Sequence, residues 1–131
     1  MPEKSELSAS MQDYMEAILE LEESEDSVRV TDVANKLHIA KASVNQTVQK
    51  FKEMGLVHQQ TYGPVELTPE GRNVADKVRQ KHRKLRQFLV EVLGVDSKIA
   101  EEDACRMEHA VSLQTMDRLT DFLYRNGLHG K

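Results

Sequence analysis

The sequence of 131 residues predicts a mainly α-helical chain, in which an N-terminal winged helix-turn-helix with a small β-hairpin precedes an α-helical domain. Apolar residues recur at helical spacing along most of the chain. Two short extended runs around Gly63-Pro64 interrupt that spacing and predict one hairpin. Three more helical segments follow the hairpin. We therefore expect one domain over residues 1–70 and a second over residues 71–131.

The first helix is expected to begin after Ser8 or Ser10, because either hydroxyl can cap its N-terminus. Apolar residues continue at helical spacing to Leu21, and the acidic stretch at residues 22–27 is expected to end the helix. Val28 and Val30 then predict a short extended step.

The second and third helices form the predicted helix-turn-helix. Thr31 is expected to cap a helix over residues 32–37, and a tight turn over residues 38–40 leads to a helix over residues 41–54. Val44, Val48 and Phe51 recur on one face of that helix. Gly55 follows as its C-terminal stop.

Extended runs at residues 56–62 and 65–68 flank the Gly63-Pro64 turn. Thr68-Pro69-Glu70 opens a long fourth helix, since threonine caps, proline suits the first helical position and an acid favours the first turn. This helix is expected to reach Val92 or Leu93, where Gly94 breaks it.

The last two helices are predicted from further caps. Asp96 or Ser97 can cap a fifth helix that reaches about Val111, and Ser112 or Leu113 begins a sixth that ends near residues 126–127.

Composition excludes several classes of protein. No window approaches the ~18 apolar residues that a spanning helix needs, so no membrane association is expected. The acidic N-terminus predicts no secretory signal. Cys105 is the only cysteine, which excludes an internal disulfide and suits a reducing cytoplasm.

Charge is distributed unevenly along the chain. Residues 1–27 carry one lysine against nine acids, residues 28–90 carry twelve lysines and arginines against five acids, and residues 91–131 carry five against eight. A basic middle suggests a polyanionic partner. Ordinary solvated helix faces would give the same pattern.

The predicted third helix presents side chains suited to the DNA major groove. Asn and Gln can pair with adenine through two hydrogen bonds, small residues allow close approach, and lysines can bind phosphates. An ordinary polar helix face is the alternative interpretation, which the adjoining hairpin makes less favourable. The candidate DNA-binding residues are Lys36, Lys41, Ala42, Ser43, Asn45, Gln46, Gln49 and Lys50.

Three predicted helices carry groups that could bind a divalent metal. Acids three residues apart share a helix face, as do residues at i, i+3 and i+4. Taken singly, such residues are solvated acids, core cysteines or core histidines; together they form a mixed oxygen and nitrogen set that suits Mn(II) or Fe(II) more than a structural zinc site. The candidates are Asp13, Glu16, His82, Cys105, Glu108 and His109.

Five segments carry a resemblance to a known family: Met-Gln-Asp-Tyr-Met-Glu at 11–16, Ser-Val-Asn-Gln-Thr-Val-Gln-Lys at 43–50, Leu-Thr-Pro-Glu-Gly-Arg at 67–72, Lys-His-Arg at 81–83 and Cys-Arg-Met-Glu-His at 105–109. From about residue 8 to 126 the chain resembles the metal-dependent repressors of the diphtheria toxin repressor and manganese transport regulator family, in a short form without an SH3-like domain.

The resemblance implies a homodimer that binds palindromic operators when a divalent metal is present, and so represses metal homeostasis genes. It also implies that the second domain binds metal and dimerises. Mn(II) is the expected metal, Fe(II) the alternative, and Zn(II) or Co(II) could bind in vitro.

The resemblance mixes two metal types. Asp13 and Glu16 match manganese-type members, Cys105 matches iron-type members, and the other three candidate ligands match both. Arg86 stands where iron-type members have a carboxylate of an ancillary metal site. Glu101 falls at another position of that site.

Dimerisation is also expected because the second domain has more apolar residues than three helices can bury alone, and a twofold dimer is the common solution. These are Leu85, Phe88, Leu89, Val92, Leu93, Leu113, Met116, Leu119, Phe122 and Leu123.

Three alternatives remain open at this point. One is a metal-independent winged-helix regulator. Another is a module that buffers metal or binds proteins without binding DNA. The third is a small carboxylate-bundle metalloenzyme, but that class uses paired Glu-x-x-His motifs and the sequence contains none, so no enzyme is expected.

Overall fold

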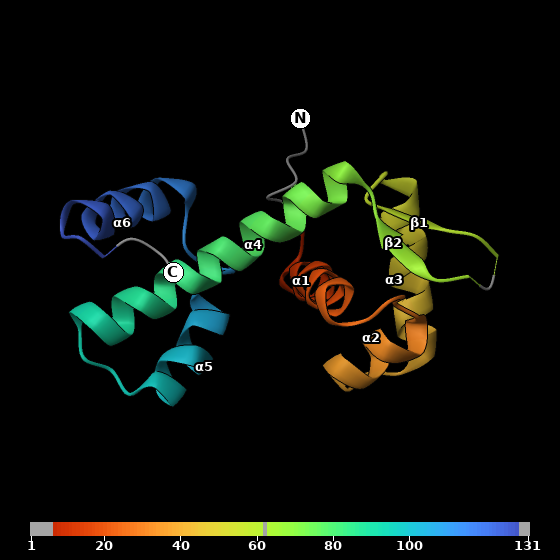
Figure 1. The fold of residues 1–131 in the computed structure, drawn as a ribbon, viewed down its shortest axis with the longest axis horizontal. Coiled ribbons are helices and arrows are strands. Elements are labelled where there is room, and N and C mark those ends of the chain that lie inside the picture. Colours follow the sequence, from red (N-terminus) through yellow and green to blue (C-terminus); the bar gives the residue numbers. More distant parts are fainter. Residues whose placement is uncertain (1–6, 62, 129–131) are drawn as a thin grey trace. The chain divides into compact units, whose positions relative to one another are not determined.

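The computed structural model describes residues 7–61 and 63–128, and packing divides the chain into two compact units, Met1–Lys77 and Val78–Lys131. Helices dominate both units, as predicted (Figure 1). In chain order the elements are α1 Ala9–Ser24, α2 Val30–Leu37, α3 Lys41–Glu53, β1 Val57–Gln59, β2 Val65–Leu67, α4 Pro69–Gln87, the π-helical turn η2 Phe88–Val92, α5 Ser97–Met107 and α6 Leu113–Arg125.

The start of α1 was predicted correctly. The backbone N–H of Met11 donates to Ser8 Oγ at 3.1 Å, so Ser8 is the N-cap. The helix ends at Ser24, within the acidic stretch. Ser24 donates to the carbonyl of Glu20 at 3.3 Å, so its hydroxyl satisfies one of the carbonyls at the end of the helix.

The start of α2 differs from the prediction. Val30 is the first residue of the helix and not part of an extended step, and Thr31 is not the cap. Instead, the side chain of Asp32 accepts a hydrogen bond from the Arg29 N–H at 2.9 Å. Val28 alone is extended, because its carbonyl accepts the Val65 N–H at 2.8 Å and adds a single bridge to the hairpin.

The turn between α2 and α3 is as short as predicted. His38 has a φ of 58°, the left-handed conformation that closes a helix, and the Ile39 N–H returns to the Ala34 carbonyl at 3.0 Å. Val33 on α2 and Val44 on α3 are fully buried. The two helices therefore meet over one core, as a helix-turn-helix requires.

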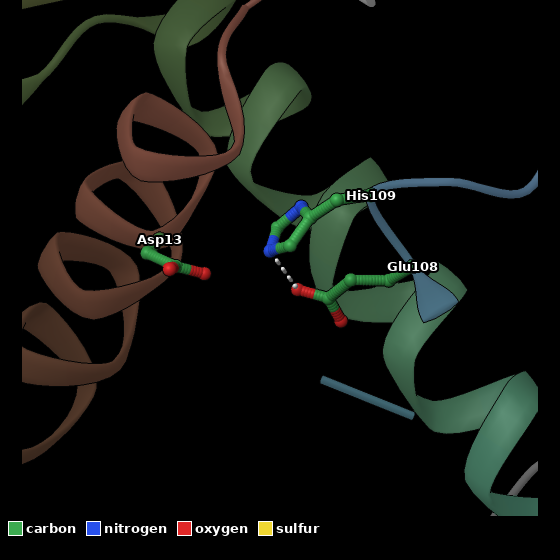
Figure 2. Close-up of side chains that lie close together, drawn as sticks. All are labelled: Asp13, Glu108 and His109. Carbon is green, nitrogen blue, oxygen red and sulfur yellow. Dashed lines mark ion pairs between the residues drawn. The ribbon is translucent and has the colours of Figure 1, made fainter. Parts of the chain in front are cut away.

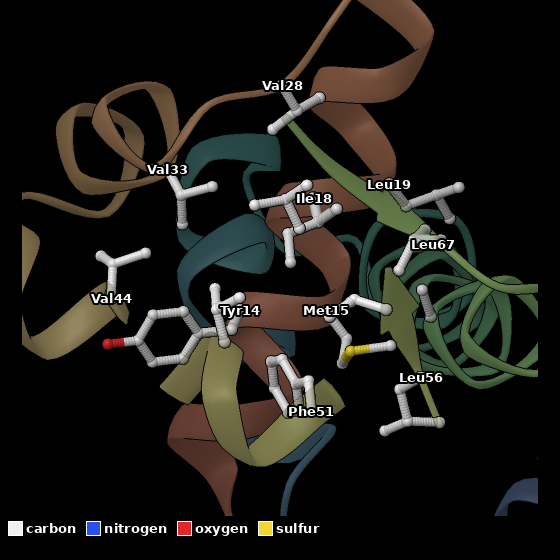
Figure 3. Close-up of a cluster of buried hydrophobic side chains, with 14 of the residues drawn as sticks. Tyr14, Met15, Ile18, Leu19, Val28, Val33, Val44, Phe51, Leu56 and Leu67 are labelled. Atoms are coloured by element: carbon white, nitrogen blue, oxygen red, sulfur yellow. The ribbon is translucent and has the colours of Figure 1, made fainter. Parts of the chain in front are cut away.

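That core joins α1, α2, α3 and the hairpin (Figure 3). Tyr14 meets Phe51 edge-on, with ring centroids 6.3 Å apart. The buried members of this core are Leu7, Tyr14, Met15, Ile18, Leu19, Val28, Val33, Ala34, Val44, Val48, Phe51, Leu56, Val57, Val65, Leu67, Val74 and Ala75.

The hairpin is attached to neighbouring elements at both of its ends. β1 and β2 pair antiparallel with Val57 opposite Leu67, and each is shorter than the predicted extended run. Tyr62, included in that run, lies outside the described residues. Glu22 accepts the Leu67 N–H at 2.8 Å and pairs with Arg72 at 2.8 Å. One carboxylate thus joins α1, β2 and α4.

Thr68 caps α4, as predicted, and it also holds the chain before β1. Its hydroxyl accepts the Gly71 N–H at 2.9 Å and donates to the Gly55 carbonyl at 2.7 Å. The Leu56 carbonyl approaches α4 so closely that a Cβ on Gly71 would overlap it. The Thr-Pro-Glu-Gly motif therefore serves packing as well as helix initiation.

We expect Gly71→Ala to lower the free energy of unfolding by about 1–3 kcal/mol, because the Leu56 backbone must shift to admit the methyl group. Urea unfolding followed by circular dichroism measures this change. Asn73→Ala, at an exposed position two residues later, serves as the control and should change stability by less than about 0.5 kcal/mol. Equal stability of the two variants would contradict the packing argument.

The second unit begins within α4, which continues through η2 and stops at Gly94, whose φ is 72°. Asp96 caps α5 by accepting the Lys98 N–H at 3.1 Å, and Ser112 caps α6 by accepting the Thr115 N–H at 3.2 Å. The core of the second unit contains Leu85, Leu89, Ala100, Ala104 and Met116.

The prediction that the fifth helix continues to about Val111 was wrong, because α5 ends at Met107. Glu108 is its C-cap and His109 lies in the turn that follows, where the N–H groups of Ala110 and Val111 both donate to the Met107 carbonyl.

The predicted dimerisation residues separate into three groups, of which Phe88, Val92 and Leu119 form the one of intermediate exposure. Leu85, Leu89, Met116 and Leu123 are buried within the chain. Leu93, Leu113 and Phe122 are exposed, to 58%, 66% and 38%. Internal packing therefore accounts for only part of the apolar surface. Among the described residues, no helix combines the length and the apolar character that crossing a membrane requires.

Candidate functional site

His82, on α4, lies between two carboxylates of the second unit. Its Nδ1 is 2.9 Å from Glu108 Oε1, and its Nε2 is 2.7 Å from Glu101 Oε2. The imidazole is buried, with only 8% of the residue exposed. Glu101 and Glu108, which follow His82 by 19 and 26 positions in sequence, thus both contact its ring.

Glu108 is the most unusual residue of this cluster, because its side chain is fully buried. Oε1 is bound to His82, but Oε2 accepts no hydrogen bond from any described residue. His109 Nε2 forms a longer ion pair with Oε2, at 3.5 Å (Figure 2). A buried carboxylate oxygen without a hydrogen bond is costly unless a cation neutralises it.

The pKa of His82 is raised to about 9 from the usual 6.5. Its hydrogen bond to Glu108 is the largest cause; burial opposes the shift, and the charges of Glu101 and Glu108 reinforce it. The ring is therefore an imidazolium at neutral pH, and it supplies positive charge beside the buried carboxylate.

The donor set fits a divalent cation. His82, Glu108 and His109 offer two imidazoles and a carboxylate, and no hydrogen bond from the described residues stabilises the charge on the buried Oε2. Mixed nitrogen and oxygen donors suit Mn(II) and Fe(II). When bound, the ion would supply positive charge that these residues otherwise obtain from a proton.

Metal binding through His82 is expected to release about one proton per ion at pH 7.5, since the ring must be deprotonated to bind a metal. A raised pKa means that the proton competes at every pH below about 9, so the apparent affinity should rise roughly tenfold per pH unit between pH 6.5 and 8.5. Calorimetry in buffers of different ionisation enthalpy counts the protons. No release at pH 7.5 would contradict ligation by His82.

The remaining predicted ligands are Cys105, Asp13 and Glu16. Cys105 is exposed on α5, three residues before the fully buried Glu108. Asp13 and Glu16 lie one turn apart on α1, in the first unit. Ligation by these three residues stays a prediction.

The contact of Glu101 with His82 was not predicted, since only the family resemblance pointed to Glu101. Glu101 Oε1 also receives Arg86 Nε at 3.0 Å, and Arg86 lies one turn after His82 on α4. The spacing of His82 and Arg86 was visible in the sequence, but nothing local indicated that an acid on α5 would meet both.

The predicted DNA-binding residues form an exposed face on the first unit. Lys41, Ala42, Ser43, Asn45, Gln46, Gln49 and Lys50 are all exposed on α3, whereas Val44, Val48 and Phe51 of the same helix are buried. Lys36, on α2, is also exposed and pairs with Glu20 at 3.2 Å. Base recognition by this face stays a prediction.

Two family models match this chain. The N-terminal DNA binding domain of iron dependent repressors matches residues 6–65, and their metal binding and dimerisation domain matches residues 68–126.

Individual proteins agree with these matches. An uncharacterized HTH-type transcriptional regulator of Methanocaldococcus jannaschii is 36% identical over 89% of this chain and 94% of its own length. The diphtheria toxin repressor of Corynebacterium glutamicum is 36% identical over 84% of this chain, which spans 48% of that repressor. A manganese-dependent transcriptional repressor solved with manganese is 32% identical, with a TM-score of 0.78 over 90% of this chain and 53% of its own.

Proposed function

Because the chain belongs to the iron-dependent repressor family, whose members are DNA-binding transcriptional repressors and not enzymes, we propose that it is a Mn(II)-responsive repressor. In this proposal it acts as a homodimer on a palindromic operator that controls metal homeostasis genes.

The observation that carries the metal part of the proposal is the buried Glu108 carboxylate, one oxygen of which has no hydrogen bond to residues 7–61 or 63–128. His82 and His109 adjoin it. Among the described residues, the His82 proton lies against this charge, and a divalent cation would neutralise it further.

We propose that Asp13 and Glu16 complete the ligand set. They lie on one face of α1 and match positions at which manganese-type members of the resembled family place ligands. Carboxylates are hard donors, which favours Mn(II). Fe(II) is the alternative metal because Cys105 offers a thiolate, which is a softer ligand than a carboxylate.

The DNA part of the proposal is supported by the exposed polar face of α3 and by the basic segment around it. In a dimer, two such helices can enter successive major grooves, about 34–36 Å apart, and read two half-sites. The exposed Leu93, Leu113 and Phe122 offer apolar surface that a second copy would cover.

The test is binding of the purified chain to DNA from upstream of its own gene at fixed salt. Samples contain chelator, Mn(II), anaerobic Fe(II), Zn(II) or Co(II), with the free metal buffered. We expect tight binding only with metal, and Mn(II) to act at free concentrations at which Fe(II) does not. Equal binding in chelator would support a metal-independent regulator, and a stronger response to Fe(II) would reverse the choice of metal.

A further inference from the structure

We propose that Glu101, itself held by Arg86, is a positioning residue that fixes the His82 ring for metal binding; this inference rests on the proposed function. The three residues form a chain of contacts within the second unit. Arg86 Nε binds Glu101 Oε1 at 3.0 Å, and Glu101 Oε2 lies 2.7 Å from His82 Nε2.

The contacts assign different roles to the two ring nitrogens. Nδ1 faces the buried Glu108, whereas Nε2 faces Glu101, which is half exposed. A ring that donates its Nε2–H to a carboxylate keeps a fixed tautomer and orientation after its other proton leaves. The nitrogen left to bind an ion is then Nδ1, on the side where Glu108 lies.

Arg86 determines how Glu101 behaves. Its guanidinium binds one oxygen of Glu101 and leaves the other for His82, so the carboxylate has no vacant oxygen in this arrangement. The positive charge of Arg86 also disfavours a second cation beside Glu101. Glu101 therefore supports a ligand and does not itself bind an ion, and each chain should bind a single ion through this cluster.

Stability alone does not explain the Arg86–Glu101 pair. Their side chains are 43% and 54% exposed, and such surface ion pairs stabilise a fold very little. Arg86→Leu should therefore leave the melting temperature nearly unchanged, so a change in metal affinity of that variant can be attributed to the site.

The experiment measures Mn(II) affinity and stoichiometry of the full chain by calorimetry for the wild type, Glu101→Ala, Glu101→Gln and Arg86→Leu. We expect about a tenfold weaker Kd for Glu101→Ala with the number of bound ions unchanged. Glu101→Gln should lose less, since its amide oxygen still accepts the Nε2–H. Arg86→Leu should also weaken binding. Glu102→Ala, at the adjacent exposed position, is the matched control and should bind as the wild type does.

A spectroscopic readout separates positioning from a general structural effect. Nitrogen-15 NMR of the histidine rings, with diamagnetic Zn(II) as the probe, is expected to show His82 coordinated through Nδ1 and protonated at Nε2. Coordination through Nε2 would overturn the proposal.

Three calorimetric results would overturn it as well. The first is an unchanged Kd in Glu101→Ala. The second is the loss of a bound ion in that variant. The third is a second ion bound by the wild type but not by the variants. A wild-type chain that binds no divalent metal would instead contradict the proposed function itself, so the two failures are distinguishable.

Discussion

Glu108→Gln is expected to abolish the metal response of DNA binding while the chain stays folded. The amide keeps the shape of the side chain, and its oxygen can still accept the hydrogen bond from His82 Nδ1. In the wild type this nitrogen lies 2.9 Å from Glu108 Oε1. The amide removes the negative charge, which is what a divalent ion would neutralise. Since the buried Oε2 makes no hydrogen bond with described residues, the fold loses little at that atom.

The expected size follows from the coupling between metal and DNA. Allosteric coupling of about 1–3 kcal/mol corresponds to a 5- to 150-fold gain in DNA affinity, and Glu108→Gln should lose this whole gain. The loss of stability should not exceed about 3 kcal/mol, the contribution of a charge-assisted hydrogen bond.

Fluorescence anisotropy of labelled DNA, with and without Mn(II), measures the response, and thermal melting verifies the fold. His109→Ala should behave similarly, because its Nε2 lies 3.5 Å from Glu108 Oε2. Glu102→Gln, on the exposed side of α5, should respond as the wild type does. A normal metal response in both site variants would show that the metal binds elsewhere.

Local signals in the sequence predicted most of the fold. Ser8, Thr68 and Ser112 each accept the backbone N–H predicted for a cap. Gly55 and Gly94 end helices in the left-handed conformation that glycine adopts readily. Capping groups and helix-ending glycines act within a few residues, so they can be recognised without knowledge of tertiary contacts.

The errors arose where a nearby alternative cap or a tertiary contact decided the outcome. Asp32 satisfies the Arg29 N–H, so α2 begins before Thr31. Val28 is held by Val65, 37 positions later, and no local pattern indicates that bridge. α5 ends at Met107 although the apolar spacing continues, which places Glu108 and His109 in a turn.

The candidate site was only partly predictable for the same reason. Residue types and spacing selected Glu108, His109 and His82 as candidate ligands, since carboxylates and imidazoles are common metal ligands. Burial of Glu108 and the contact of Glu101 with His82 depend on how α4 and α5 pack. Those features determine the charge state of the site, and they became visible only in the structure.

Asn45→Ala and Gln49→Ala are each expected to lower affinity for the operator by roughly 5- to 150-fold, the 1–3 kcal/mol that a two-bond contact to a base provides. Both residues are exposed one turn apart on α3, whereas Val44 and Val48 of the same helix are buried. Alanine favours a helix, so neither change should weaken the fold. Affinity for random DNA should stay the same, because phosphate contacts carry nonspecific binding.

Lys50→Ala is the informative comparison, since a lysine that contacts phosphate acts on every sequence alike. We expect it to weaken operator and random DNA by the same factor and to reduce the dependence of log Kd on log salt by about one. Titrations at several salt concentrations, with Mn(II) present throughout, measure both quantities. If Asn45→Ala instead weakens both DNAs equally, α3 binds the backbone and the bases are read by another element.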